Sequence, residues 1–333
     1  MTARLRGIDR NLLGIAFMAV VLLPVPVVLS GSNREIAVRV LLFALLASAW
    51  NLMGGFAGLF SFGHAAFFGI GAYTTAYLLV EHDVSPWLGM AAGGALAAAF
   101  AVATGFLAFR YRLRHAYFAL ATFAFAEMLR LVAVNLDLIK GSLGIQVPRL
   151  SEPSWTMLQF APNSPNYFFA ALILLVAALT SIVLLMRSRS GWVTLAMRDD
   201  EEAAESLGVH AMRHKLTIAA ASGALTAVGG AFYFQFVFFI DPDLAFGSSV
   251  SVEIFLGAII GGTGTIWGPV VGAFLFVLLG EFTSWLVRDP PTGLSFLEGR
   301  SGLDLLLYGL IIVVIILFFP RGVLGSLTSR GAR

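Results

Sequence analysis

The residue types that usually carry out catalysis are scarce in this sequence. Its 333 residues include five His and no Cys, which excludes disulfides, thiolate nucleophiles and thiolate metal sites. The phosphate-binding pattern GxxxxGK(S/T), the zinc pattern HExxH and the nucleophile pattern GxSxG do not occur. We therefore expect no enzyme activity, no ATP hydrolysis by this chain itself, and no metal or other cofactor bound to it.

One short stretch concentrates charge. MRDDEEAAESLGV, residues 197–209, contains five acidic residues in a chain that is only 12% charged. Asp199 or Asp200 can cap a helix N-terminus, and Asp199 and Glu202 have the spacing of a capping box. The acids would then lie at the positive end of the helix dipole, and Gly208 suits the position just past the helix. The stretch predicts a two-turn helix over about 200–207, preceded by another short helix near Trp192.

The small residues of this helix suggest what it does. Ala203, Ala204 and Leu207 are expected to form a small apolar patch, which suits docking into the groove of a partner protein. The alternative is a solvated loop whose charges only keep it out of lipid.

A second pair of charges lies within an apolar run. Glu127 and Arg130 are three residues apart, so on a helix they share one face and can neutralise each other. We expect an intramembrane ion pair that fixes the orientation of its helix. A role in gating is the alternative.

The rest of the sequence explains why these charges stand out. It is 59% hydrophobic with a mean hydropathy of +0.88, and its continuous apolar runs are long enough to cross a bilayer. Such runs exclude a β-barrel, whose strands alternate. We predict an all-α polytopic membrane protein, a single transmembrane domain over 1–333 with about 8–10 membrane-embedded helices. The expected spans are 11–30, 36–53, 64–80, 86–109, 116–135, 166–187, 216–240, 249–261, 268–287 and 302–319.

The first span follows three arginines, as in a signal peptide, but it is longer than a usual signal sequence and lacks a clear cleavage site. An uncleaved helix is the favoured interpretation.

The distribution of basic residues predicts the orientation, because cytoplasmic segments are enriched in Lys and Arg. With both termini inside, fourteen basic residues are cytoplasmic: Arg4, Arg6, Arg10, Arg110, Arg112, Arg114, Arg187, Arg189, Arg198, Arg213, Lys215, Arg321, Arg330 and Arg333. Six are outside: Arg34, Arg39, Lys140, Arg149, Arg288 and Arg300. This places a loop over 188–215 in the cytoplasm, and loops over 136–165 and 288–301 on the other side. The small net charge of +2 gives no reason to expect a nucleic acid as partner.

Two glycine-rich segments interrupt apolar spans. They read GGFAGLFSFGHAAFFGIGAY, from Gly54, and GGTGTIWGPVVGAF, from Gly261. Broken backbone in a membrane is expected only inside protein or along a cavity, and paired interruptions often mark a transport path. We therefore place four polar residues near such a path: Ser61, His64, Thr263 and Thr265. The alternative for the glycines, including Gly63, Gly69, Gly268 and Gly272, is close helix packing.

Four stretches of the sequence resemble those of a known family. Glu202-Ala203-Ala204, followed after three residues by Gly208 and after nine more by Ile218, is similar to the EAA loop of ABC importer permeases, although Ala219-Ala220 replace the usual Leu-Pro. With NLMGGFAGLFSFGHAAFFGIGAY, GAIIGGTGTIWGPVVGAF and FFPRGVLG, the chain resembles permeases of branched-chain amino acid ABC importers, of the LivM type, over about residues 36–325.

This resemblance implies a permease subunit for leucine, isoleucine and valine in a bacterial or archaeal cytoplasmic membrane. The implied partners are a second homologous permease, two ABC ATPases that use the ATP, and an extracytoplasmic solute-binding protein. The ATPase-coupling residues it implies are Arg198, Asp199, Asp200, Glu202, Ala203, Ala204 and Gly208.

Other functions stay open at this point. Relatives of this architecture carry urea, short amides or other small amphipathic solutes. A self-contained secondary transporter could also use glycine-broken helices, but it would have no need of a docking helix. A scaffold subunit would have glycines for packing alone.

Overall fold

Helices form almost all of the regular structure in the computed structural model, which describes residues 2–113, 115–150, 152–290 and 302–330. Most of the outer segment predicted at 288–301 therefore lies outside the described residues. In chain order, the long helices are α1 (Thr2–Leu22), α3 (Ser32–Asn51), α4 (His64–His82), α5 (Pro86–Arg110), α6 (His115–Asn135), α7 (Pro165–Arg187), α10 (Ala211–Val237), α12 (Ser248–Gly261), α13 (Gly268–Arg288) and α14 (Leu303–Phe318).

The shorter elements connect these helices. They are α2 (Val25–Val28), the π-helix η1 (Leu52–Phe56), the 3-10 turns η2 (Asp137–Ile139) and η3 (Gly141–Leu143), α8 (Arg189–Asp199), α9 (Glu201–Ser206), α11 (Pro242–Phe246), α15 (Gly322–Arg330) and the two-residue strands β1 (Ile145–Gln146) and β2 (Phe239–Ile240).

The prediction of an all-α polytopic membrane protein is confirmed. Within the described residues, nine helical segments are long and apolar enough to cross a membrane. The one predicted span that is not among these nine, 64–80, is α4, a helix of 19 residues that lies among the others with most of its side chains buried. The first predicted span, 11–30, divides into α1 and α2 at Pro24, because proline cannot donate the backbone hydrogen bond that would continue the helix.

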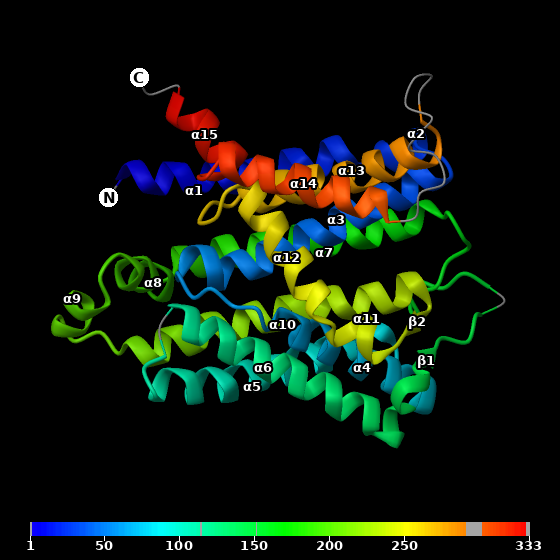
Figure 1. The fold of residues 1–333 in the computed structure, drawn as a ribbon, viewed down its shortest axis with the longest axis horizontal. Helices are drawn as coiled ribbons and strands as arrows, with labels where there is room; N and C mark the ends of the chain where they lie inside the picture. The colour runs from blue at the N-terminus through cyan, green and yellow to red at the C-terminus, as the bar shows by residue number, and fades with distance from the viewer. Residues whose placement is uncertain (1, 114, 151, 291–301, 331–333) are drawn as a thin grey trace.

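The helices form two layers with α12 running obliquely between them (Figure 1). One layer contains α4, α5, α6, α10 and α11, and the other contains α1, α3, α7, α13 and α14. Glycines allow the close approaches inside the first layer. A Cβ on Gly71 would collide with the carbonyl oxygen of Ala227 in α10, and one on Gly230 would collide with that of Phe68 in α4. Close helix contact at small residues is the usual way that membrane helices gain packing energy.

The two ends of the bundle differ. Both chain termini lie at the end that carries α8 and α9, while β1 and β2 lie at the opposite end (Figure 1). There the segment 136–165 packs onto the bundle through the antiparallel pairing of Ile145 with Ile240 and through Arg149, whose guanidinium lies 5.1 Å from the Phe238 ring centroid. This arrangement fits the predicted topology, in which both termini share one side. Which side of a membrane that is stays a prediction from the basic residues.

Candidate functional site

The acidic stretch forms the predicted pair of short helices. Helix α8 begins after Ser188, whose hydroxyl accepts a hydrogen bond from the Gly191 N–H at 3.4 Å, and α9 begins after Asp200, whose carboxylate accepts from the Ala203 N–H at 3.0 Å. Asp199 is the last residue of α8, so Asp200 alone provides the cap. Gly208 follows α9 with a φ of +83°, a left-handed conformation that glycine adopts without strain.

The prediction of an exposed apolar patch is wrong for one of its three residues, Ala204. Ala204 is only 5% exposed and packs with Met197 of α8 and Ala211 of α10 inside the corner between the helices. Ala203 and Leu207 face outward, and Leu207 is 87% exposed. Two-turn helices bury one side when they fold back on a neighbour, and the sequence alone does not say which alanine takes that side.

An ion pair ties α9 to the bundle. The Lys215 ammonium of α10 lies 2.5 Å from a carboxylate oxygen of Glu201 at the start of α9. On α8, the Ser190 hydroxyl lies 3.1 Å from Nδ1 of His214, also in α10. The helical pair is therefore attached to the bundle at both of its helices.

Arg198 points away from the exposed side of this pair. Its Nη1 donates a hydrogen bond to the Gly55 carbonyl oxygen at 3.1 Å, while its Nη2 lies 3.6 Å from Asp199. A Cβ on Gly58 would lie 3.1 Å from Arg198 Cγ, so the aliphatic part of the Arg198 side chain passes close to the backbone of Gly58. The guanidinium thus links α8 to the end of η1.

The first glycine-rich connection, residues 57–63, leads from η1 back into the protein interior. Its polar backbone groups are satisfied by side chains from several helices, as unpaired backbone groups in an apolar interior are costly. The Trp50 indole donates to the Ser61 carbonyl oxygen at 2.8 Å, and the Thr122 hydroxyl accepts from the Phe62 N–H at 3.1 Å. One residue into α4, the Ala65 N–H donates to the Ser251 hydroxyl at 2.8 Å.

His64 lies at the inner end of this connection and is fully buried. Its Nε2 is 2.9 Å from the Ser222 hydroxyl oxygen, which itself donates to the Ala49 carbonyl oxygen at 2.7 Å. Since the single hydroxyl proton is used toward Ala49, Nε2 must carry the imidazole proton and donate it to Ser222. Nδ1 is then an acceptor without a partner among the described residues. Ser61 and His64 are thus held inside protein in this conformation.

The second glycine-rich connection, residues 262–267, is a turn between α12 and α13. Gly262 and Gly264 have positive φ values, and the Thr265 hydroxyl accepts from the Gly268 N–H at 2.9 Å and donates to the Gly262 carbonyl oxygen at 3.1 Å. Thr263 and Thr265 are exposed. The structure therefore separates the four predicted path residues into a buried pair and an exposed pair.

Asn51, which the sequence analysis missed, holds the second connection beside the end of α3. Its amide nitrogen donates to the Thr265 carbonyl oxygen at 2.9 Å, and its amide oxygen accepts from the Gly264 N–H at 2.7 Å. Gly55 lies beside the same turn, where a Cβ would collide with the Gly264 nitrogen. The available signal was a single asparagine at the end of an apolar span, three residues before the pair Gly54-Gly55.

The glycines singled out for packing or path lining make close contacts here. A Cβ added at Gly63 would collide with the Thr122 carbonyl oxygen, and one at Gly69 would collide with the Phe246 ring. A Cβ at Gly268 would collide with the Gly262 carbonyl oxygen, and one at Gly272 with the Gly257 carbonyl oxygen. In this conformation these four positions pack helices and turns against each other.

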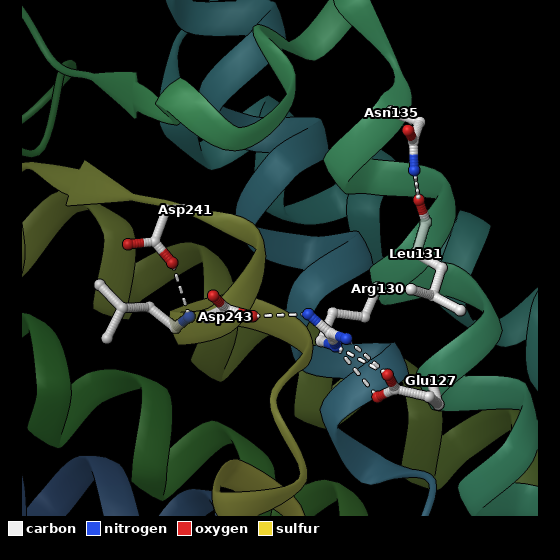
Figure 2. Close-up of polar contacts among 7 residues, drawn as sticks. Glu127, Arg130, Leu131, Asn135, Asp241 and Asp243 are labelled. Atoms are coloured by element: carbon white, nitrogen blue, oxygen red, sulfur yellow. Dashed lines mark hydrogen bonds and ion pairs between the residues drawn. The ribbon is translucent and has the colours of Figure 1, made fainter.

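Glu127 and Arg130 are brought together, with a third partner that the sequence did not reveal. Arg130 Nε lies 3.0 Å from both carboxylate oxygens of Glu127, and Arg130 Nη1 lies 2.7 Å from a carboxylate oxygen of Asp243 in α11 (Figure 2). Within the part of the chain that the structure describes, no three His, Asp or Glu side chains gather as metal ligands.

Comparisons with known proteins assign the chain to a family. A sequence model described as "Branched-chain amino acid transport system / permease component" matches residues 34–317. The chain belongs to this family. Family members are transport permeases rather than enzymes, and the nine apolar helices of the described residues are consistent with this membership.

Relatives within this permease family include proteins of both bacteria and archaea. The chain is 28% identical over 320 residues to the high-affinity branched-chain amino acid transport system permease protein LivM of Escherichia coli, covering 90% of this chain and 71% of the relative. It is 24% identical over 301 residues to the corresponding LivH of Salmonella typhimurium, covering 85% and 91%. A probable LivM of Methanocaldococcus jannaschii is 23% identical over 229 residues, covering 68% and 64%. No solved structure matches this permease.

Proposed function

We propose that this chain is the membrane permease subunit of a binding-protein-dependent ABC importer for the branched-chain amino acids leucine, isoleucine and valine. Family membership and the names of the bacterial and archaeal relatives support this function. The protein would be a multi-pass component of a bacterial or archaeal cytoplasmic (inner) membrane.

The proposed assembly contains a second homologous permease, two ABC ATPases and an extracytoplasmic solute-binding protein. The similarity of this chain to both LivM and LivH, two differently named permeases, supports pairing with a second permease. The absence of a phosphate-binding pattern supports the view that only partner subunits use ATP and that this chain binds no cofactor. The end that carries β1, β2 and the segment 136–165 would receive the binding protein.

Helices α8 and α9, within the cytoplasmic loop 188–215, would couple the ATPases to the membrane helices. The observation that best supports this proposal is the contact made by Arg198, whose side chain extends from α8 to the Gly55 carbonyl oxygen. A Cβ on Gly264 would also lie 3.0 Å from Arg198 Nη1, so this one side chain adjoins both glycine-rich connections. A displacement of α8 therefore acts directly on the place where the two connections meet.

The proposed role of each residue in α8 and α9 depends on whether its side chain faces outward or toward the bundle. Ala203 and Leu207, on the exposed side, would contact the ATPase, and Asp200, Glu202 and Gly208 would shape α9 for that contact. Ala204 and Asp199 would hold the corner between the helices. Arg198 would transmit motion inward, because ATP can shift a conformational equilibrium only through contacts that differ between the two states.

The experiment combines copurification with transport. The tagged protein is purified in mild detergent with its partners, reconstituted in liposomes, and supplied with leucine-loaded binding protein. We expect two ATPases and a second permease to copurify, and ATP to drive leucine uptake. A chain that purifies alone and still moves solute would overturn the proposal, while uptake with a urea-loaded but not a leucine-loaded binding protein would overturn only the solute assignment.

Two variants separate docking from transmission. Leu207→Arg should prevent copurification of the ATPases, because it places a charge on a highly exposed apolar side chain directly after α9. Arg198→Ala should keep the ATPases bound but leave ATP hydrolysis without uptake, and Arg198→Lys should restore little because a single ammonium lacks the planar fork. Loss of ATPase binding in Arg198→Ala would contradict the inward role.

A further inference from the structure

Three charged side chains form a cluster on the outer surface of α6 and α11 (Figure 2). Arg130 Nη2 lies 2.6 Å from Glu127, and Arg130 Nη1 lies 2.7 Å from Asp243. These side chains are not enclosed by the rest of the chain. The exposed fractions are 25% for Arg130, 37% for Glu127 and 80% for Asp243.

Glu127 and Arg130 lie within the apolar span Ala116–Asn135, and Asp243 is the second residue of the span Pro242–Gly261. Arg130 is five residues before the last residue of α6, which corresponds to about 7.5 Å along a helix, and Glu127 is about 12 Å from that end. Phe123, Met128, Leu131 and Val132 surround it on the same helix, and their side chains are exposed and apolar. The charges are thus located where a lipid-facing helix would have only apolar side chains.

The charges do not balance. Glu127 and Asp243 contribute two carboxylates against one guanidinium, so the cluster has a formal charge of −1. Ionised groups facing hydrocarbon are strongly disfavoured, and those found within membrane spans almost always face protein or water.

Helix α14 shows what a lipid-compatible surface looks like in the same molecule. Its exposed large side chains are apolar along the length of the helix: Leu305, Leu306, Leu310, Val313, Val314, Leu317 and Phe318. Lipid can cover this face at no electrostatic cost, whereas the face of α6 and α11 needs a polar neighbour at Asp243.

The same side of α6 is apolar around its charged residue. Phe123, Ala124, Met128, Leu131 and Val132 line this side together with Glu127 and Asn135. Such a surface suits contact with a helix whose side chains are apolar around one polar position.

We infer that the face formed by α6 and α11 is where the second permease subunit packs. That subunit would place a basic or hydrogen-bond-donating side chain opposite Asp243, which balances the residual negative charge. The inference rests on the proposed function, since it names the face used by a partner of that assembly.

Photo-crosslinking tests the face directly. A photoreactive phenylalanine analogue is introduced at Met128, which is 47% exposed on α6, or at Val313, which is 53% exposed on α14. Both variants are irradiated in native membranes after copurification has established that the second permease is present. We expect a covalent product with the second permease from position 128 and none from position 313.

Several outcomes overturn the inference. A product with the second permease from position 313 and not from 128 would assign the interface to the other layer. Lipid adducts alone at position 128, in membranes from which the second permease still copurifies, would mean that lipid covers this face. A product with another copy of this chain would contradict a distinct partner, whereas failure of the second permease to copurify would count against the proposed function instead.

A substitution at Asp243 tests the role of the residual charge. Asp243→Asn keeps the shape of the side chain but removes the residual charge, and we expect about a tenfold fall in the second permease recovered per copy of this chain. Asp304→Asn, at the start of α14, is the control and should leave recovery unchanged. Equal recovery from both variants, at equal yield of folded protein, would show that the charge of Asp243 has no part in the interface.

Discussion

The two glycine-rich connections differ in their surroundings. The first, residues 57–63, ends in the protein interior, whereas the second, residues 262–267, forms a turn in which both threonines are exposed. In the first, backbone groups bond to the side chains of Trp50 and Thr122, and His64 beyond it bonds to Ser222. In the second, the main bonds come from Thr265 within the turn and from Asn51 beside it.

This difference shows that glycine content alone does not define a role. In the first connection glycine lets the backbone pass between helices, and the surrounding helices must supply hydrogen-bond partners. In the second, glycine provides positive φ angles and the close approach of α12 and α13. Removing a hydrogen-bond partner from the first connection should therefore destabilise the protein interior. Removing one from the second should destabilise an exposed turn, unless the same residue supports both connections.

The largest effect is expected from Gly261→Ala. The new methyl group would collide with the Gly268 carbonyl oxygen across the α12–α13 hairpin, and neither backbone can move without breaking the turn. Overpacking of this kind costs about 3 kcal/mol or more. We expect little monodisperse protein after detergent extraction. Gly309→Ala in α14, where a Cβ would meet nothing within 4 Å, is the control and should give normal yield and melting temperature.

Ser222→Ala should have the next largest effect, because it acts on the buried end of the first connection. The change leaves the His64 Nε2–H and the Ala49 carbonyl oxygen without their partner in a fully buried place. Unsatisfied buried groups cost about 1–3 kcal/mol each. Thermal unfolding in detergent should show a clear fall in midpoint. Ser181→Ala, which removes an exposed hydroxyl bonded to its own helix, should change the midpoint little, and equal falls would contradict the comparison.

Asn51→Leu should release the second connection from the end of α3. It removes the two hydrogen bonds that hold residues 264 and 265 beside η1, at a cost of about 2 kcal/mol because Gly264 is only partly buried and Thr265 is exposed. We also expect loss of uptake beyond what the loss of folded protein explains, since Arg198 contacts the same junction. Asn135→Leu, at the exposed end of α6, is the matched control for stability. Full uptake by Asn51→Leu would show that the two connections work independently.

Thr265→Val should have the smallest effect. It removes the hydroxyl that accepts a hydrogen bond from the first N–H of α13 in an exposed turn, where water can replace part of the lost bonding, so we expect a cost of about 1 kcal/mol. The midpoint of thermal unfolding should fall by less than for Ser222→Ala. Thr263→Val is the control, because the Thr263 hydroxyl makes no hydrogen bond within the described residues. If Thr265→Val proved as damaging as Ser222→Ala, the second connection would be as dependent on its polar contacts as the first.

Local features of the site could be predicted from the sequence. The two short helices, the cap near Asp200 and the glycine after α9 follow from capping rules that involve neighbouring residues only. The pairing of Glu127 with Arg130 follows from one helical turn. Asp243 could not be predicted as their partner, because it lies 113 residues further along the chain and α11 is placed by packing against α4 and α6.

The sequence by itself determined the class of the protein, the approximate spans and the family to which it is similar, since apolar length, basic-residue bias and motif spacing are properties of the chain. Only the tertiary structure decided that Ala204 faces inward, that Arg198 reaches Gly55, and that Asn51 bonds to a turn more than 200 residues further along the chain. These contacts depend on which side of each helix is covered by its neighbours. That choice is made by packing over the whole bundle, because a short polar segment between apolar helices has no periodicity strong enough to fix it.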